Sequence, residues 1–187
     1  MAILRVTLQA LLYGTLGLTL LLRGACGAEA PTEYQVKAVF VYNFSRFVEW
    51  PSQAFTAPNE PFDICILGSD PFGARLDEAV RGEHIDQHPL AVRRFRTLAE
   101  IGGCRILYID RSESTQLQQI LAALDHRTTL TVSDLDDSAQ RGVMIQFTTE
   151  NNRIRLRINV ESARGAGLTI SSKLLRSADI VSARNGS

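Results

Sequence analysis

Two thiols are the first candidates for chemistry in this 187-residue chain. Cys65 and Cys104 stand on apolar segments that read as strands, so they could pair as a disulfide or remain small buried side chains. A disulfide needs Cα atoms within about 7 Å, which neighbouring strands supply and separated strands do not. A redox-catalytic role is disfavoured because nothing resembles the Cys-x-x-Cys pattern. The residues alone leave the choice between bonded and free thiols open.

Histidines could form a metal site. His84 and His88 are four residues apart, with acidic neighbours, and on a helix they would face the same side as two metal ligands. However, Gly82 and Pro89 predict a loop here, and His126 is isolated. Exposed loop histidines are therefore the favoured interpretation, and no metal is expected.

The motifs of nucleotide-binding proteins and serine hydrolases are incomplete. The stretch 68–73 follows an apolar segment but lacks the three-glycine spacing that lets a backbone approach a pyrophosphate. Gly102 and Gly103 precede a strand instead of following one. Neither Ser171 nor Ser172 sits in a nucleophile elbow. The sequence therefore gives no positive evidence for an enzyme, and we expect no cofactor.

Three arginines form the clearest polar pattern. Arg153, Arg155 and Arg157 alternate with apolar residues, so on a strand all three guanidinium groups share one face. One interpretation is an ordinary solvated face opposite the core. The other is a docking surface for an acidic partner protein.

The first 28 residues predict an export signal. Arg5 supplies a small positive region, residues 6–22 are mostly apolar, and residues 24–28 are small. A membrane-spanning helix needs about 20 mostly apolar residues, and this run is shorter and rich in Gly and Thr. We expect cleavage after Ala28. Lipidation of Cys26 is the alternative, which Arg23 disfavours because it stands where a lipoprotein signal needs an aliphatic residue.

The remaining 159 of the 187 residues, 29–187, suit one domain. The full chain has 20 basic and 20 acidic residues, and the expected signal removes two arginines, which leaves a net charge of −2. A charge this small predicts no nucleic-acid partner.

Apolar patterning defines the expected elements. A largely buried helix over 33–49 ends before Pro51. Strands and helices then alternate, which is typical of a parallel sheet; the strands are expected at 62–68, 90–95, 104–109 and 128–132, and the helices at 71–80 and 112–124. Runs at 143–148 and 153–159 flank a turn and predict a hairpin, and the final helical patterns cover 161–166 and 171–183. The expected fold class is a single α/β domain with a mixed, mostly parallel sheet, helices on both faces and a C-terminal antiparallel hairpin.

Two segments together resemble a known family. Residues 37–51 read KAVFVYNFSRFVEWP, and residues 153–159 run on to 167–175, which read GLTISSKLL. Both are similar to the YfiR family of periplasmic regulators. The resemblance implies a non-enzymatic, periplasmic protein that represses a membrane diguanylate cyclase by binding its periplasmic part, and so controls cyclic di-GMP signalling. It also implies a second partner, an outer-membrane OmpA-like lipoprotein that sequesters the regulator.

The family's two strand cysteines fall on Cys65 and Cys104, so the resemblance implies a disulfide between them. The chain departs from the family because it has no cysteine after Cys104, where some members carry a second pair. A redox sensor that depends on that second pair is therefore not expected here. The sequence leaves open whether the protein forms a homodimer.

A small-ligand binding protein of the periplasm is the alternative function. In parallel α/β sheets, ligands bind in a crevice at the carboxyl ends of the strands. That crevice would lie near residues 68–71 and 110–112.

Overall fold

The computed structural model describes residues 32–125 and 127–183. The expected signal peptide, with Cys26, and His126 lie outside the described residues. No helix within the described ranges has the length and apolar character needed to cross a bilayer.

The first described helix, α2 (Glu33–Phe47), begins at a capping box. The Thr32 hydroxyl accepts from the Gln35 backbone N–H, and the Gln35 side chain accepts from the Thr32 N–H, so two otherwise unpaired donors are satisfied. The helix ends two residues earlier than expected, because the Phe47 carbonyl accepts from the Ser171 N–H at 2.9 Å and the next residues are extended.

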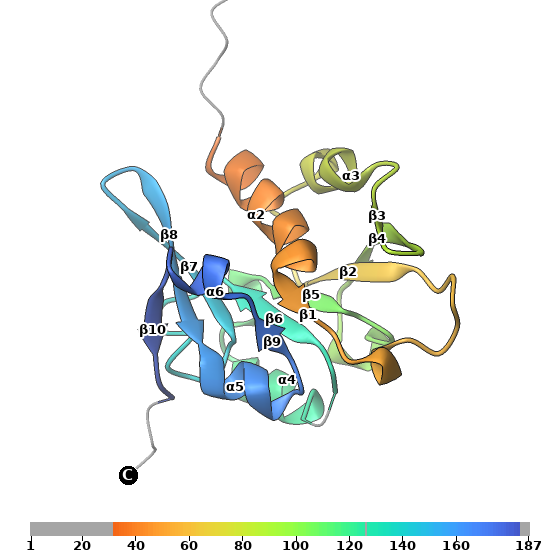
Figure 1. Cartoon of the computed structure of the whole chain (residues 1–187). Helices are drawn as coiled ribbons and strands as arrows, with labels where there is room; N and C mark the ends of the chain where they lie inside the picture. Colours follow the sequence, from red (N-terminus) through yellow and green to blue (C-terminus); the bar gives the residue numbers. More distant parts are fainter. Residues whose placement is uncertain (1–31, 126, 184–187) are drawn as a thin grey trace, which may run out of the picture. The chain divides into compact units, whose positions relative to one another are not determined.

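An eight-stranded sheet lies behind α2 in the order β10-β8-β7-β6-β5-β2-β4-β3 (Figure 1). Its strands are β2 (Phe62–Leu67), β3 (His84–Ile85), β4 (His88–Phe95), β5 (Ile106–Ile109), β6 (Leu130–Ser133), β7 (Ile145–Glu150), β8 (Arg153–Asn159) and β10 (Asp179–Val181). Strands β4, β2, β5, β6 and β7 pair in parallel, β8 pairs antiparallel with β7, and β3 pairs antiparallel with β4. A separate two-stranded sheet joins β1 (Val48–Glu49) to β9 (Thr169–Ile170).

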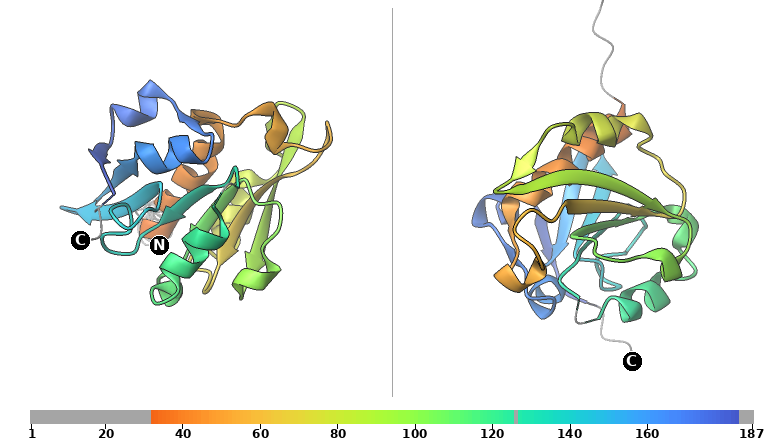
Figure 2. Two further views of the ribbon diagram at one scale, coloured as in Figure 1. Left: turned by 90° about the horizontal axis from the view of Figure 1, so that it is seen from below. Right: turned by 90° about the vertical axis from the view of Figure 1, so that its right-hand side faces the viewer.

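The two faces of the large sheet bury separate apolar clusters. On β2, Ile64 and Ile66 point towards α2, whereas Cys65 and Leu67 point to the opposite face. The first face also packs against α3 (Ala74–Val80), α5 (Val160–Gly165) and α6 (Ser172–Leu175), and the second packs against α4 (Leu117–Ala123). Figure 2 shows α5 and α4 on opposite sides of the sheet. The expected α/β class, with helices on both faces and a C-terminal hairpin, is confirmed.

Two parts of the expected secondary structure are wrong. The helix expected over 171–183 is only α6, after which the chain forms β10 and pairs in parallel with β8. The β-branched residues Ile180 and Val181 suit a strand, and the edge of β8 supplies a partner that local sequence does not reveal. The segment around His84 and His88, expected as a loop, forms the β3–β4 hairpin with Asp86 in its turn at φ 52°.

A disulfide joins the middle of β2 to the segment just before β5, because Cys104 lies two residues ahead of the strand. Cys65 and Cys104 have Cα atoms 5.8 Å apart, and both are buried. Strands β2 and β5 are neighbours, and although Cys65 pairs with Leu107 in the ladder, the chain before β5 brings Cys104 within the distance that a disulfide needs. The structure therefore has the bonded alternative and not the free thiols, and both half-cystines are buried.

We predict that this bond stabilises the fold. It closes a loop of 39 residues, which in the chain-entropy model adds about 4 kcal/mol to the free energy of unfolding. The double substitution Cys65→Ala with Cys104→Ala should lower that free energy by up to about 4 kcal/mol in urea unfolding. The double variant should still bind, at low temperature, the protein partner that the family resemblance implies. Loss of that binding with folding intact would instead identify a redox switch.

Candidate functional site

The three sequence-predicted arginines lie on the β7–β8 hairpin. Its strands pair over six positions, from Ile145 opposite Ile158 to Glu150 opposite Arg153. The turn residues Asn151 and Asn152 both have positive φ, 50° and 57°, as a two-residue type I′ turn requires. Asparagine tolerates this conformation better than most residues, so the turn sequence fixes the register of the hairpin.

The outer part of this hairpin extends beyond its neighbours in the sheet. Strand β6 pairs with β7 only at Ile145 and Gln146, and β10 pairs with β8 only at residues 157–159. The segment 147–156 therefore has no further strand on either side within the described structure. Figure 1 shows this hairpin projecting away from the rest of the domain. We call residues 147–156 the projecting hairpin.

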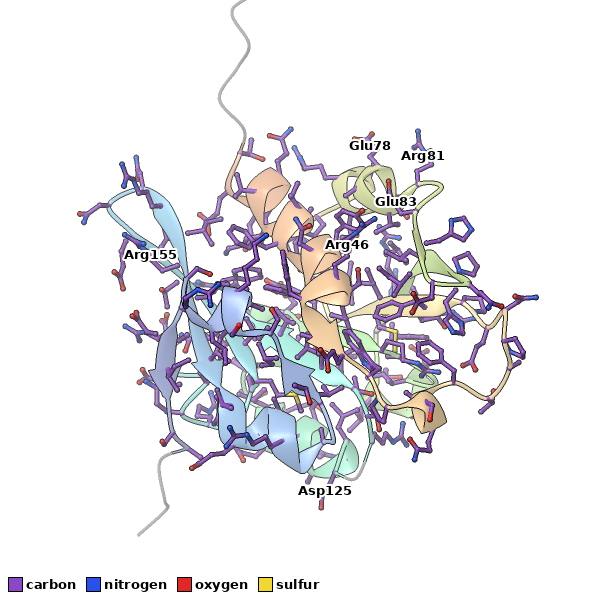
Figure 3. The ribbon with its side chains drawn as sticks, viewed as in Figure 1. Arg46, Glu78, Arg81, Glu83, Asp125 and Arg155 are labelled. Atoms are coloured by element: carbon purple, nitrogen blue, oxygen red, sulfur yellow. A yellow bond between two sulfur atoms is a disulfide. The ribbon has the colours of Figure 1, made fainter. Side chains whose placement is uncertain are left out.

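The structure separates the three arginines into two kinds. Arg153 and Arg155 are exposed, and neither forms an ion pair in the described part of the chain. Figure 3 places Arg155 on the projecting hairpin. Arg157 lies at the root, is partly buried, and has its Nη2 3.8 Å from Oε1 of Glu150. The two outer arginines therefore remain available to a partner, whereas Arg157 belongs to the body of the domain.

A cavity of about 450 Å³ lies beside the root of the hairpin. Its lining combines cations, carboxylates and hydroxyl groups, and includes Lys37, Arg111, Asp136, Thr148 and Arg157. Because the charges of both signs are mixed, this lining selects neither a simple anion nor a simple cation.

A buried ion pair next to this cavity holds α2 against the sheet. Lys37 and Asp134 are each 1% exposed, and Nζ of Lys37 lies 2.7 Å from Oδ2 of Asp134. The Tyr34 hydroxyl donates to the same carboxylate at 2.9 Å, and Arg111 Nε lies 3.2 Å from its other oxygen. Lys37 also lies 2.6 Å from Glu33, a partner near the surface.

Burial opposes the ionisation of Asp134, but the hydrogen bond and positive charge of Lys37 and the hydrogen bond from Tyr34 outweigh it. The pKa of this carboxyl group therefore lies below its usual value. A lowered folded-state pKa means that the ionised carboxylate stabilises the fold above the unfolded-state pKa of about 3.9. This stabilisation is lost as the pH falls through the folded-state pKa.

We predict that Asp134→Asn lowers the free energy of unfolding at pH 7 by about 3–5 kcal/mol, because it removes the buried counter-charge of Lys37 and leaves only the half-exposed Glu33. The matched control, Glu33→Gln, removes the outer partner, whose side chain is 46% exposed, and should change stability by less than about 1 kcal/mol. Urea unfolding at pH 7 and at steps down to pH 2 measures both effects. The difference between wild type and Asp134→Asn should shrink below about pH 4; a difference independent of pH would contradict this account.

The crevice expected at the carboxyl ends of the strands, near residues 68–71 and 110–112, is occupied by side chains over Gly68, whereas Arg111 lines the 450 Å³ cavity. The Ser69 N–H donates to the Ser112 hydroxyl at 3.1 Å, so the loops after β2 and β5 are in contact. Gly68 has a φ of 91°, and a Cβ at this position would collide with the side chains of Ser112 and Glu113. The space directly over Gly68 is therefore occupied by the protein itself.

A larger groove, of about 860 Å³, lies instead at the amino end of β2. Trp50 and Phe62 meet edge to face at 4.9 Å, and the Phe55 ring stacks on His88 at 3.8 Å. His88 is held by a 2.7 Å hydrogen bond to the Glu60 carbonyl. His84 also lines the groove. Across the described ranges, no group of three or more histidine, cysteine or acidic side chains could hold a metal ion.

The two segments that carry the family resemblance meet in space. Glu49, next to Trp50, pairs with Thr169, and Val48 pairs with Ile170 in the β1–β9 sheet. The β1–β9 pairing therefore holds the residues that follow α2 against the residues that precede α6. This contact gives the paired motifs a structural role, which their separation in the sequence hides.

The fold and the site define an α/β domain with a projecting, positively charged hairpin and a buried core on each face of its sheet. Residues 34–179 match the family described as YfiR/HmsC-like, and the chain belongs to that family. This family is regulatory, non-catalytic and periplasmic. A search of curated proteins finds no match to this chain.

Proposed function

We propose that this protein is a periplasmic regulator that binds the periplasmic part of a membrane diguanylate cyclase and represses it. Family membership over residues 34–179 is the observation that carries the proposal. The export signal expected over residues 1–28 supports it, because such a signal would deliver the chain to the compartment in which the partner's domain lies.

The projecting hairpin supports a role in protein binding. Arg153 and Arg155 are exposed on one face of a strand, about 7 Å apart, as two residues separated by one position on a strand must be. Ion pairs with exposed arginines contribute little on a free surface, but they gain strength when a partner excludes water. We assign Arg153 and Arg155 to the partner surface, with Arg157 at its inner boundary.

Repression requires a difference in affinity. The regulator shifts the cyclase towards its inactive arrangement only to the extent that it binds that arrangement more tightly than the active one. An outer-membrane OmpA-like lipoprotein that binds the same regulator would lower its free concentration and release the cyclase. Competition between two partners is then sufficient to pass a signal, and no chemical step on the regulator is needed.

The direct experiment measures binding and repression together. The mature protein, purified from the periplasm, is titrated against the isolated periplasmic domain of the diguanylate cyclase encoded nearest to its gene, by calorimetry. The same protein is then added to the full-length cyclase in detergent, and cyclic di-GMP synthesis is measured. The proposal expects saturable binding and a fall in synthesis over the same concentration range, and absence of both would overturn it.

We predict that the double reversal Arg153→Glu with Arg155→Glu weakens this binding at least tenfold, which corresponds to about 1.4 kcal/mol. The matched control carries the same charge change on other exposed arginines, Arg75→Glu with Arg164→Glu, and should bind as the wild type does. If both double variants lose affinity equally, overall charge is responsible and the hairpin is not the partner surface.

A further inference from the structure

The register of the β7–β8 hairpin determines which backbone groups face outwards. In a two-residue hairpin, the pair next to the turn, Glu150 and Arg153, exchanges both of its hydrogen bonds. The bonding then alternates along the strands, so Thr149 and Ile154 form a non-hydrogen-bonded pair. The N–H and C=O of Ile154 therefore point away from β7, towards the outer edge of the sheet.

This outer edge is open where the arginines lie. Strand β10 occupies the edge of β8, but its first residue, Asp179, pairs with Arg157. Within the described structure, no other residue hydrogen-bonds the backbone of Ile154. The free edge therefore has an unpaired backbone donor and acceptor at its centre, with an exposed arginine on each side of Ile154.

We propose that an extended segment of the partner protein adds to the sheet as a strand along Arg153–Leu156, in line with β10. Backbone hydrogen bonds to Ile154 would provide the pairing, as in other cases of strand addition. Side chains on such a strand alternate between the two faces. The added segment therefore carries acidic residues two positions apart, facing Arg153 and Arg155, and an apolar residue between them, facing the half-buried Ile154.

The charge pattern excludes a second copy of this chain as the added strand. If the same edge from two molecules paired, arginines of one copy would lie against arginines of the other. Directly opposed like charges destabilise a strand pair, whereas opposed acidic and basic side chains stabilise it. Among extended segments, an acidic one is the chemistry that this edge fits.

The first experiment uses a defined probe, the acetylated and amidated heptapeptide TEVDVET, added to isotope-labelled protein and followed by NMR. Binding should shift the amide signals of the projecting hairpin and should weaken at high salt.

N-methylated versions of the peptide test whether it binds as a strand. In a strand, alternate N–H groups point to the partner, so N-methylation of one alternate set of peptide residues should abolish binding and methylation of the other set should not. If the peptide runs antiparallel to β8, the N–H groups of its valines bond to Ile154. If it runs parallel, the N–H groups of its acidic residues do so. Equal binding of both methylated peptides, or no binding of TEVDVET, would overturn the inference.

The second experiment tests the protein edge. Proline lacks a backbone N–H and is tolerated on an edge strand where that group faces solvent. Ile154→Pro should therefore leave the hairpin folded and weaken binding of TEVDVET and of the cyclase domain at least tenfold. Ile154→Val keeps the N–H and should bind as the wild type does. Arg155→Pro removes an N–H that bonds to β7, so it should lower the melting temperature more than Ile154→Pro does.

The inference rests on the proposed function for the identity of the partner, and the two fail differently. If the wild type binds the cyclase domain and Ile154→Pro binds it equally well, strand addition is wrong and the proposed function stands. If the wild type binds TEVDVET but not the cyclase domain, the proposed function is wrong, and strand addition at the open edge of β8 remains supported.

Discussion

A lysine buried under the first helix is the constraint on which the arrangement of this domain depends. An unpaired buried ammonium group would be very costly, so Lys37 must be close to Asp134 at the end of β6. This requirement sets the position of α2 along the sheet. The end of α2 then leads into β1, which pairs with β9 and so ties the first helix to the C-terminal part of the chain. One ion pair thereby helps to position elements that are far apart in the sequence.

The outer part of the hairpin packs against α2 through Phe147 but has no further strand beside it in the described structure. Strand β6 turns away after Ser133 to place Asp134 under α2, and β7 continues beyond it. Thr149 keeps one contact with the helix, a 3.2 Å hydrogen bond to Glu33, but the other side of the hairpin has no strand beside it beyond β10. The exposed edge that we assign to partner binding lies on the other side of the hairpin, along β8, and is open because β10 begins only opposite Arg157. In this account, a rigid body presents a short strand pair whose exposed arginines and free backbone groups recognise another protein.

Local patterns in the sequence were sufficient to predict the class of the fold, but they did not predict which strands pair with each other. The alternation of Arg153 to Ile158 predicts the hairpin strand because every second side chain is apolar, and Asn151 with Asn152 predicts the turn. Residues 179–181 could not be assigned as a strand, since their conformation depends on the distant edge of β8. The sequence also could not show that Arg155 is exposed whereas Arg157 is partly buried, because this difference depends on where β10 begins. Lys37 looked like one polar residue on an apolar helix, and nothing in the local sequence pointed to Asp134, which lies 97 positions away.

Hydrogen exchange of the protein with and without the periplasmic domain of the cyclase is the most direct test of the central claim, that this protein recognises its partner through the projecting hairpin. Exchange slows where backbone N–H groups become hydrogen-bonded or excluded from water. Binding should protect peptides covering residues 147–156, with the amide of Ile154 among the most strongly protected. Protection confined to the groove around Trp50 and His88, with the hairpin exchanging at its free rate, would contradict it.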